Sequence, residues 1–357
     1  ASETAVIFTV LTSPDVPQAT MWGHMPDTLK ARDYTFSRPK LAAEVDNEGG
    51  TVNDHNETWS TFTWSGADKH CDILPGMRQF GALATVVPTS VQDVAGWPMQ
   101  GNFYWSSLAG MSGQHHAADV SNRSEAQKPD DTTFIVSCVD KEAPDVEPKL
   151  VLTPGSYDST IKAMKVKVGE EASLRLTITD SKNNDQPLAY YYFSLHLDDG
   201  INRKNQTDAA WETHPVQIDG GSNVRKVDAH TYEGITDANG EATLTLTQPG
   251  GVGVKTHITA RMRSDFTASD EKDVIFTVIT SPDTDKARMW GHMLGIIEAN
   301  NIFKRPRLAD ETDNELGSVR ENNEDWALFD QNSSMQAECG LGHIPVSYTH
   351  LRAHETP

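Results

Sequence analysis

The segment TDANGEATLTL, residues 236–246, places turn-forming residues directly before an alternating strand. The side chains of Asp237 and Asn239 can hydrogen-bond the backbone of a turn, and Gly240 can adopt the positive φ that many turns need. From Ala242 to Leu246 apolar residues alternate with threonine, so one face of the predicted strand is apolar. The segment therefore predicts a structural turn followed by a half-buried β-strand.

Short alternating strands surround this segment. Residues 173–179 read SLRLTIT, and residues 256–262 and 273–279 supply two further strand patterns. Turn-forming residues at 180–185 and 249–251 separate these patterns. Several short strands separated by such turns predict an antiparallel β-sandwich.

Two polar parts of this region could have a role beyond the core of the sandwich. The acidic turn at Asp237 and Asn239 could bind calcium, but the ligand ladder of an EF-hand with its terminal glutamate is absent. We therefore favour a structural turn and expect no metal or cofactor. The polar stretch from 198 to 232 holds few strand signals and is expected to be an inserted loop or hairpin of undefined role.

The region before residue 140 has weaker alternation and dense aromatic residues. Residues 67–71 read as a short helix and residues 133–139 as a closing strand. Trp97, Tyr104 and Trp105 could stack on a sugar or anchor a protein contact, or they could form the core of a small domain. Trp97, beside the proline of a turn, is expected to be the most exposed of the three.

Two family resemblances follow from these motifs. Residues 236–246 closely resemble the turn-and-strand signature of the bacterial Ig-like repeats of invasins and intimins. Residues 57–140 resemble the C-type-lectin-like fold, through a cysteine after an early helix, a GWP…YWSS stretch at 96–107 and a closing V-x-C-V strand at 136–139. The calcium-binding Glu-Pro-Asn, Gln-Pro-Asp and Trp-Asn-Asp segments of sugar-binding members are absent, so the resemblance implies a protein or glycan contact without calcium.

A long internal repeat links the two ends of the chain. VIFTVLTSPD at residues 6–15 returns as VIFTVITSPD at residues 274–283, an offset of 268 residues. MWGHM at residues 21–25 returns at residues 289–293 with the same offset. The repeat predicts one complete unit followed by the start of another. The MWGHM segments lie where modules join, and we favour a packing role at a hinge over ligand binding.

The repeat also indicates how the three cysteines pair. Cys71 is matched by Cys339, whereas the equivalent of Cys138 would lie beyond residue 357. Cys71 and Cys138 are therefore predicted to form a disulfide, which leaves Cys339 without its partner; the alternative is a pair of unrelated buried thiols. Closing a loop of about 67 residues would stabilise the module by roughly 4 kcal/mol on the loop-entropy model. A disulfide also implies an oxidising compartment.

These patterns predict a mainly β chain of modules arranged like beads on a string, with an Ig-like β-sandwich flanked by C-type-lectin-like (α+β) modules. The predicted order is the last strand of a preceding truncated Ig-like module (1–13), a C-type-lectin-like adhesion module (14–140), a linker (141–148), an Ig-like module (149–281), a truncated second adhesion module (282–344) and a probable sequencing artefact (345–357). The artefact is inferred because residues 346–356 resemble one reading frame of a transposase adapter used in sequencing libraries. The first strand, residues 5–11, should be weakly held without its sheet partners.

Charge and hydropathy exclude several classes of function. Acidic residues outnumber basic ones, 51 to 30, which gives a formal net charge of −21. Such a surface repels phosphate backbones, so nucleic-acid binding is not expected. No apolar stretch approaches the roughly 20 residues that span a bilayer, and the first residues lack a signal peptide. We therefore expect no membrane insertion by these residues and place any export signal or anchor elsewhere.

The resemblances imply an extracellular adhesion fragment of an invasin/intimin-type bacterial protein, anchored in the outer membrane through other parts. Its lectin-like modules would bind a host-cell or matrix protein or glycan, and its Ig-like modules would act as spacers. A purely structural stalk is the first alternative. A carbohydrate-active enzyme is a second alternative that we do not favour, because Gly-x-Ser-x-Gly, HExxH and Walker motifs are absent and no carboxylate pair stands out.

Overall fold

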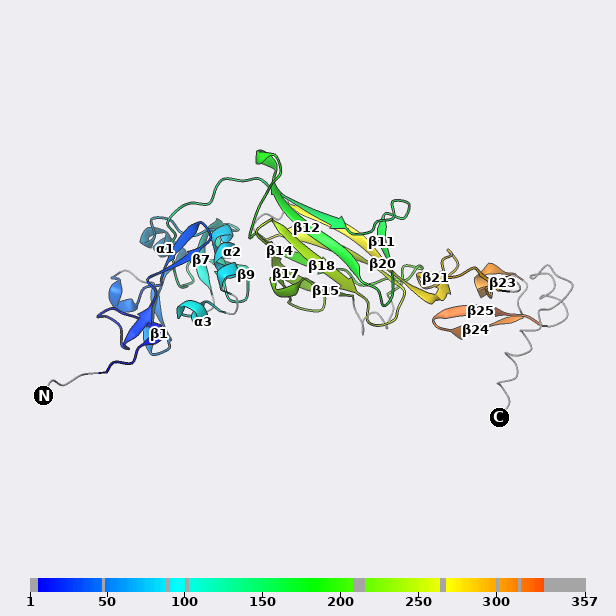
Figure 1. Cartoon of the computed structure of the whole chain (residues 1–357), viewed down its shortest axis with the longest axis horizontal. Helices are drawn as coiled ribbons and strands as arrows, with labels where there is room; N and C mark the ends of the chain where they lie inside the picture. Colours follow the sequence, from blue (N-terminus) through cyan, green and yellow to red (C-terminus); the bar gives the residue numbers. More distant parts are fainter. Residues whose placement is uncertain are drawn as a thin grey trace.

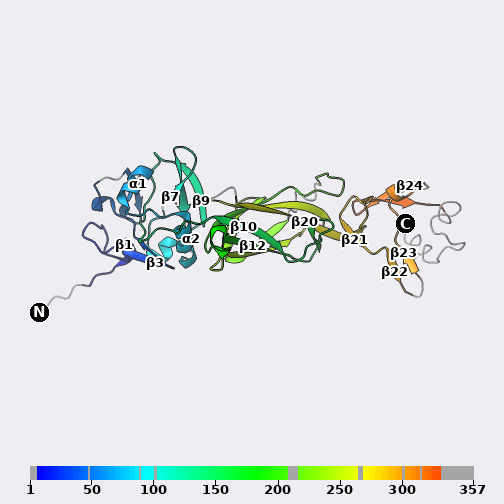
Figure 2. The same cartoon turned by 90° about the horizontal axis from the view of Figure 1, so that it is seen from above.

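The computed structural model describes residues 6–46, 49–87, 90–99, 103–207, 216–263, 268–299, 302–313 and 316–330. Three modules follow one another along the long axis of the molecule (Figures 1 and 2). We call them the N-terminal module (residues 6–140), the central module (148–282) and the C-terminal module (283–330). The described chain is thus mainly β; its described α-helices lie in the N-terminal module, while short 3₁₀ turns occur in all three modules.

The central module is a sandwich of two sheets. One sheet has the order β10 (Pro148–Pro154), β12 (Ala172–Asp180), β18 (Glu241–Thr247) and β15 (Gln217–Asp219), with β13 (Gln186–Pro187) beside β12. The other has the order β11 (Ala163–Lys167), β20 (Ser269–Pro282), β19 (Val254–Met262), β14 (Tyr192–Leu197), β17 (Thr231–Ile235) and β16 (Val224–Lys226). Their pairs are antiparallel except that β11 runs parallel to β20.

The predicted alternation places the core between these sheets. Along β12 the side chains of Leu174, Leu176 and Ile178 are each 0% exposed, while the residues between them are exposed or half-buried. They pack against Leu244 of β18 and Phe276 of β20 in one apolar cluster. The strands predicted at 173–179, 242–247, 256–262 and 273–279 are therefore confirmed, because a period of two fits a sheet with one buried face.

The predicted turn before β18 is confirmed in detail. The Asp237 carboxylate accepts hydrogen bonds from the backbone N–H of Asn239 (2.8 Å) and of Glu241 (2.9 Å). Gly240 has a φ of +71°, and an added Cβ would lie 2.7 Å from the carbonyl oxygen of Ile178. The turn therefore needs glycine for both its backbone conformation and its close approach to β12.

The expectation for the polar stretch 198–232 is only partly right. Its described residues 216–232 hold short strands: β15 joins one sheet, while β16 and the start of β17 join the other. Sequence alternation missed them because β15 and β16 have three residues each, too few to show a period. Residues 208–215 of this stretch lie outside the described residues.

The N-terminal module combines small hairpins, three helices and one three-stranded sheet. Its elements in chain order are β1 (Val10–Pro14), β2 (Gly23–Met25), β3 (Thr28–Ala31), β4 (Tyr34–Ser37), β5 (Gly50–Asp54), β6 (Glu57–Thr61), α1 (Trp64–His70), α2 (Met77–Val86), α3 (Val91–Ala95), β7 (Tyr104–Ala109), β8 (Gln114–Asp119) and β9 (Ser124–Pro129). Its α+β character is compatible with the predicted lectin-like fold, which stays a prediction.

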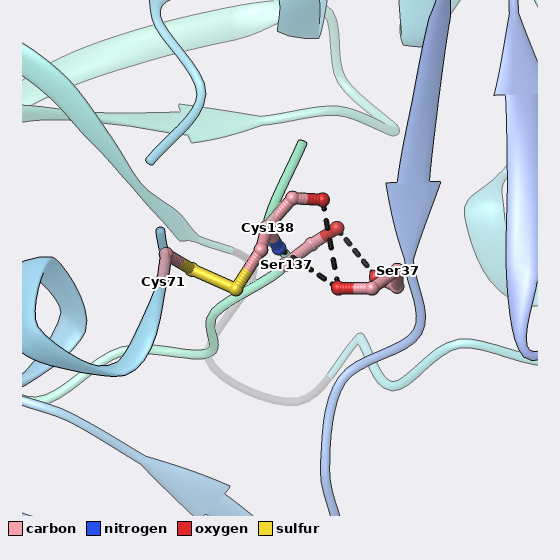
Figure 3. The surroundings of a disulfide bond; sticks show 4 residues. All are labelled: Ser37, Cys71, Ser137 and Cys138. Carbon is pink, nitrogen blue, oxygen red and sulfur yellow. Dashed lines mark hydrogen bonds between the residues drawn. A yellow bond between two sulfur atoms is a disulfide. The ribbon is translucent and has the colours of Figure 1, made fainter. Parts of the chain in front are cut away.

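The predicted disulfide joins Cys71 and Cys138 across a sequence separation of 67 residues (Figure 3). Cys71 follows α1, the helix predicted at 67–71, which begins three residues earlier, at Trp64, because the Thr63 hydroxyl caps the Gly66 N–H. On the other side, the backbone N–H of Cys138 donates to Ser37 Oγ (3.1 Å). The disulfide therefore ties α1 to the closing segment and to β4. Cys339 lies outside the described residues.

The predicted closing strand at 133–139 is wrong as a regular strand. Phe134, Ile135 and Val139 each make an isolated bridge, to Phe62, Tyr104 and Phe36 respectively. The segment passes from one partner to the next and never runs alongside one strand, so no continuous ladder forms. Ile135, Val136 and Val139 are nonetheless buried, which explains the strand-like pattern.

The C-terminal module repeats the first part of the N-terminal module. Its elements are β21 (Gly291–Met293), β22 (Ile296–Glu298), β23 (Ile302–Lys304), β24 (Gly317–Glu321) and β25 (Glu324–Leu328). The buried Arg38 pairs with Glu44, at 2.6 Å from Nη2 to Oε1, and their equivalents Arg305 and Glu311 pair in the same way. The sequence repeat is therefore a structural repeat as well.

The first strand predicted at residues 5–11 begins only at Val10. Its equivalent, Val274–Thr277, lies inside β20 between β11 and β19 and pairs with both. Residues 6–9 contact no such strands, and Phe8 is 87% exposed whereas its equivalent Phe276 is 0% exposed. The difference arises because no strand of the described residues lies beside residues 6–9, and a single strand cannot satisfy its backbone or bury its side chains.

The N-terminal and central modules share one apolar cluster. Tyr190, Tyr192 and Ile235 of the central module pack among the core residues of the N-terminal module. Gly81 of α2 lies so close that an added Cβ would be 1.9 Å from the carbonyl oxygen of Tyr190. The Arg32 guanidinium also lies over the Tyr190 ring, 4.7 Å from its centroid. The two modules are thus docked and not merely tethered.

Charged groups are buried at this same junction. Glu125 of β9 is 3% exposed, and its Oε1 lies 3.5 Å from Nε of Arg263, which also pairs with Glu233. His116 lies on the other side, with Nδ1 3.7 Å from the same Glu125 oxygen. Burial raises the pKa of Glu125 to about 7, because removal from water outweighs the attraction of Arg263. Burial also lowers the pKa of His116, and nearby Arg263 and His115 lower it further.

We predict that Gly240→Val destabilises the chain by roughly 2–4 kcal/mol, because a β-branched residue combines an unfavourable positive φ with a clash against β12. Denaturant unfolding measures the change. Gly251 offers a matched control, since it has a φ of +70° but no atom within 4 Å of an added Cβ. Gly251→Val should therefore cost clearly less, and equal losses would contradict the role assigned to the contact with Ile178.

We predict that Glu125→Gln stabilises the chain at pH 8.5 by about 1–3 kcal/mol and has little effect near pH 4. A carboxyl whose pKa rises on folding binds its proton more tightly in the folded state, so its unfavourable contribution develops as the pH rises from about 4.5 to about 7. The free energy of unfolding of both proteins, measured from pH 4 to pH 8.5, tests this. His116 lies 3.7 Å from Glu125, so the same comparison is repeated in a His116→Gln background to separate the two titrations.

Glu142 provides the control for the overall charge. It is exposed in the linker, so Glu142→Gln removes one negative charge without touching the junction. A similar gain at high pH in this variant would assign the effect to the net charge of the chain and not to burial of Glu125.

Candidate functional site

The three predicted ligand-contact residues lie in the core. Trp97 and Trp105 are 0% exposed and Tyr104 is 2% exposed. The Trp105 indole donates to the carbonyl of Phe62 (2.7 Å), and the Tyr104 hydroxyl donates to the carbonyl of Pro98 (2.9 Å). Burial, with the charges of Asp54 and Asp119, raises the pKa of Tyr104. The expectation that Trp97 is exposed is wrong, because the ring, which follows α3 and its turn, lies in the core. With all three rings buried, they do not offer a direct ligand contact.

A different set of aromatic side chains reaches the surface of the N-terminal module. We call it the aromatic face; it comprises Trp64, Phe103, His115, Lys128, Asp130 and Phe134, all half-buried. The sequence shows the aromatic density of this region but does not separate exposed rings from buried ones. A signal was available in the alternation of β8, where His115 and His116 must point to opposite sides of the sheet.

The aromatic face is held by stacking and by specific hydrogen bonds. The rings of Trp64 and His115 stack with centroids 3.5 Å apart and planes 8° apart. The Trp64 indole donates to the carbonyl of Ser106 (3.0 Å), and His115 Nδ1 lies 2.7 Å from Oδ1 of Asp130. These contacts fix the rings before any ligand arrives, which lowers the entropy cost of binding.

A cation completes the aromatic face. The Lys128 ammonium lies 4.3 Å from the ring centroid of Phe103 and 6.0 Å from that of Phe134. Beneath these rings lies the cluster that contains Cys71 and Cys138, so the disulfide supports the surface from below. The flat rings can stack on a sugar. Together with the ammonium and the carboxylate, they can also anchor a protein side chain.

A second, polar surface lies at the turn between β5 and β6. A shallow depression there is lined by Asn53, Asp54, His55, Asn56, Gln92 and Met99. His55 Nδ1 contacts Asp54 Oδ1 (2.5 Å) and Gln92 Nε2 (2.6 Å). His55 and Asn56 have positive φ, as do their equivalents Asn322 and Asn323 in the C-terminal module. The repeat thus preserves the hairpin turn but not the histidine, which favours a structural reading of this surface.

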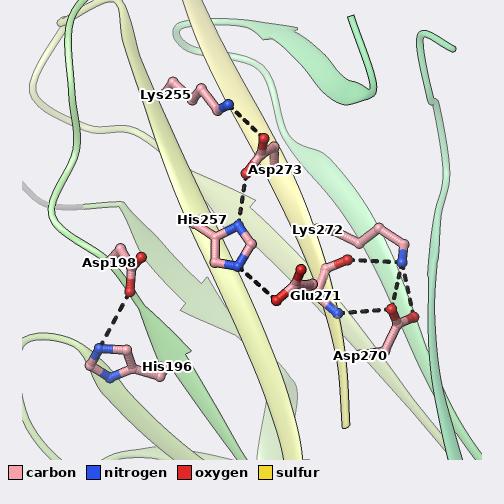
Figure 4. A network of polar contacts seen from close by, with 8 residues as sticks. All are labelled: His196, Asp198, Lys255, His257, Asp270, Glu271, Lys272 and Asp273. Atoms are coloured by element: carbon pink, nitrogen blue, oxygen red, sulfur yellow. Dashed lines mark hydrogen bonds and ion pairs between the residues drawn. The ribbon is translucent and has the colours of Figure 1, made fainter. Parts of the chain in front are cut away.

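A third polar surface lies on the central module (Figure 4). His257 of β19 lies between two carboxylates, with Nδ1 2.8 Å from Asp273 and Nε2 3.3 Å from Glu271. Partial burial lowers the pKa of His257, but the hydrogen bonds and charges of Asp273 and Glu271 outweigh it, so the pKa is raised overall. Lys255 also pairs with Asp273 at 2.6 Å. These cross-strand contacts stabilise the sheet and leave few free groups for a ligand.

Metal chemistry finds no support in the part of the chain that the structure describes. Within it, no three His, Cys, Asp or Glu side chains are grouped so that they could hold a metal ion. The turn residues Asp237 and Asn239 bind each other and the backbone. Likewise, none of the helices within the described ranges has the length and apolar character needed to cross a membrane.

Comparison with known families gives two matches. The InvE-type adhesion domain matches residues 14–139 and again residues 282–354, and the bacterial immunoglobulin-like 21 domain matches residues 169–279. The three matched segments follow the N-terminal, central and C-terminal modules in order. No protein with a curated description matches the chain.

Similar solved structures include other bacterial adhesins. The Yersinia pseudotuberculosis adhesin InvE is 22% identical with a TM-score of 0.45, over 85% of this chain and 65% of that one. The D00–D0 domains of intimin are 14% identical with a TM-score of 0.24, over 46% of this chain and 62% of that one. The Escherichia coli adhesin FdeC is 12% identical with a TM-score of 0.24, over 46% of this chain and 41% of that one.

The chain spans 65% of the InvE structure and smaller shares of the other two. These distant likenesses carry no argument about ligands. The family match is of a different kind, because its two segments together cover more than half of the chain. With its central bacterial immunoglobulin-like domain, this chain belongs to the InvE-type adhesion-domain family of invasin/intimin-type adhesins.

Proposed function

We propose that this chain is the extracellular, non-catalytic adhesive part of a bacterial surface protein and that it binds a host-cell or matrix protein or glycan. The observation that carries the proposal is the adhesion-domain match, which occurs on both sides of the central module. Modules that recur along one chain multiply a weak contact by raising the effective concentration of the next one. The oxidising compartment implied by the Cys71–Cys138 disulfide fits a surface location.

We place the adhesive contact on the aromatic face of the N-terminal module. This surface combines half-exposed rings with a cation and a carboxylate, and the stacked pair of Trp64 and His115 is already fixed. Contact surfaces that bind tightly tend to centre on tryptophan, tyrosine and arginine with surrounding polar groups. The polar surfaces at His55 and His257 present imidazoles that are engaged in internal hydrogen bonds, and the residues described around them include no Trp, Tyr or Phe.

A structural stalk is the second candidate, and the docked junction of the N-terminal and central modules favours it. Tyr190 and Gly81 fix the two modules against each other, as a spacer requires. In that case the aromatic face is only the rim of a disulfide-linked core. The two candidates differ in whether this chain alone binds a ligand.

We predict that Trp64→Ala and Lys128→Ala each weaken binding of the full chain at least tenfold, because each removes a central group of the contact. Binding is measured on cultured epithelial cells, on immobilised matrix proteins and on a glycan array. Lys128→Ala guards against loss of folding, since its ammonium lies over the half-buried rings of Phe103 and Phe134 and Lys128 is not part of the buried core. Thermal unfolding of each variant verifies the fold.

Tyr157 supplies the matched control. It is an aromatic side chain on the central module and is 48% exposed, so Tyr157→Ala removes a ring without touching the aromatic face. Unchanged binding in both test variants would move the contact elsewhere on the chain. Absence of binding by the unaltered chain on every surface would favour the stalk.

A further inference from the structure

The N-terminal module exposes an unusual group of apolar side chains at its first MWGHM segment. Phe8 is 87% exposed, Trp22 is 65% exposed and Met21 is 39% exposed. Asp15 lies between Phe8 and Met21 in the repeated sequence and is also exposed. We call Phe8, Asp15, Met21 and Trp22 the Trp22 surface. Large exposed apolar side chains within one repeated segment can mark a place where another molecule or module packs.

The second copy of the same segment shows what covers such a surface. Met289, the equivalent of Met21, is 2% exposed and packs with Val252 and Val278 of the central module. The indole of Trp290, the equivalent of Trp22, donates to the carbonyl of Ile201 (3.2 Å). The Arg203 guanidinium covers the same ring, 4.6 Å from its centroid.

The approach of the two modules at this second copy is close. An added Cβ at Gly253 of the central module would lie 2.3 Å from the carbonyl oxygen of Trp290. Arg203 also donates its backbone N–H to the carbonyl of Arg288 (2.9 Å) and pairs with the carboxylate of Asp283. The end of the central module is therefore shaped to receive this segment through backbone, ring and charge contacts together.

Both copies hold the segment in the same conformation. The backbone N–H of Val10 donates to the carbonyl of Trp22 (2.9 Å), as that of Val278 does to Trp290 (3.0 Å). Thr9 Oγ1 lies 2.9 Å from His24 Nδ1, and the equivalent pair, Thr277 and His292, has the same distance. The uncovered copy is thus preformed for docking, which reduces the entropy cost of binding.

We propose that the Trp22 surface docks the end of an Ig-like module of the same kind as the central module. In this arrangement the module places its equivalents of Ile201, Arg203 and Gly253 over Trp22. Residues 6–9 complete its sheet, as Val274–Thr277 complete that of the central module. The inference rests on the alternating modules of the proposed function but not on ligand binding.

Charge supports this occupant and also separates the two junctions. Asp15 retains the carboxylate that Asp283 offers to Arg203. The other acidic partners are not retained, since the repeat places Pro17 at the position of Asp285 and Ala43 at that of Asp310. The apolar contact and one arginine–carboxylate pair therefore provide the attraction at the Trp22 surface.

The test extends the full chain by one module. A second copy of residues 148–268 is fused ahead of Ala1, so that residues 1–14 continue it as residues 269–282 continue the original. The protein is labelled with 5-fluorotryptophan, and the solvent exposure of Trp22 and Trp290 is read from fluorine NMR, with Trp22→Phe and Trp290→Phe to assign the signals. We expect the exposure of Trp22 to fall to that of Trp290 in the extended chain.

Arg203→Ala placed only in the added copy tests the mode of docking. We expect it to expose Trp22 again while Trp290, covered by the unaltered Arg203, serves as the internal control. The proposal is overturned if Trp22 keeps its original exposure in the extended chain, or if it stays covered despite this substitution. It is also overturned if the added copy remains sensitive to protease, because residues 6–14 would then not complete the sandwich.

One further outcome concerns the occupant of the Trp22 surface. Concentration-dependent covering of Trp22 in the unextended chain would identify a second copy of this chain as the occupant and would overturn the proposal. Cell binding is measured separately, so a loss of the proposed adhesive function would leave the fluorine result unchanged.

Discussion

A buried carboxylate holds the joint at which each adhesion module begins, and the orientation of that module relative to the preceding strand depends on it. Glu324 is 2% exposed and accepts hydrogen bonds from the Ser281 hydroxyl (2.8 Å) and the backbone N–H of Met289 (2.7 Å). It thereby ties the end of β20 to the MWGHM segment and to β25. Glu57 makes the same set of contacts in the first copy and is equally buried. Charge-assisted hydrogen bonds of this kind are strong and directional, so the joint has one geometry in both copies.

This fixed joint changes how a chain of modules presents its surfaces. Flexibly linked modules search a large volume, whereas docked modules hold their contact surfaces at a set spacing and orientation. The central module is docked at both ends, through Tyr190 on one side and Met289 on the other. An adhesive surface on the N-terminal module would therefore be presented at a fixed angle to the axis seen in Figure 1. Multivalent binding then depends on whether ligands match that spacing, because a rigid geometry gains nothing from sites it cannot span.

Sequence reasoning succeeded where one residue pattern dictates one local structure. The strand from Ala242 and the turn at Gly240 were predictable because alternation and positive φ each have a direct backbone consequence. The pairing of Cys71 with Cys138 followed from the repeat. The aromatic residues of the N-terminal module gave no such guidance, since a tryptophan at a helix start or in a turn can be half-buried, as Trp64 is, or fully buried, as Trp97 is.

Tertiary contacts between distant residues were beyond the reach of local patterns. Glu125 and Arg263 lie 138 residues apart and meet only because two modules dock. Glu57 could have been found, however, because the repeat keeps a glutamate two residues before Trp59 and again before Trp326 while the residue between them changes. Retention of a charged residue between two copies that otherwise vary indicates a contact that the fold needs. The same comparison would have separated the buried clamp from the many solvated carboxylates of this acidic chain.

The two junctions of the central module rely on different physical forces, and this difference has consequences for the whole chain. The junction with the N-terminal module buries Glu125 and His116 beside the half-buried Arg263 and aromatic side chains, so its stability responds to pH more than to salt. The junction with the C-terminal module carries surface pairs such as Lys204 with Asp310, both about half-exposed, and these weaken as ionic strength rises. Its apolar contact between Met289 and Val252 does not weaken in this way. The two junctions should therefore weaken under different conditions, the first as the pH changes and the polar part of the second as the ionic strength rises.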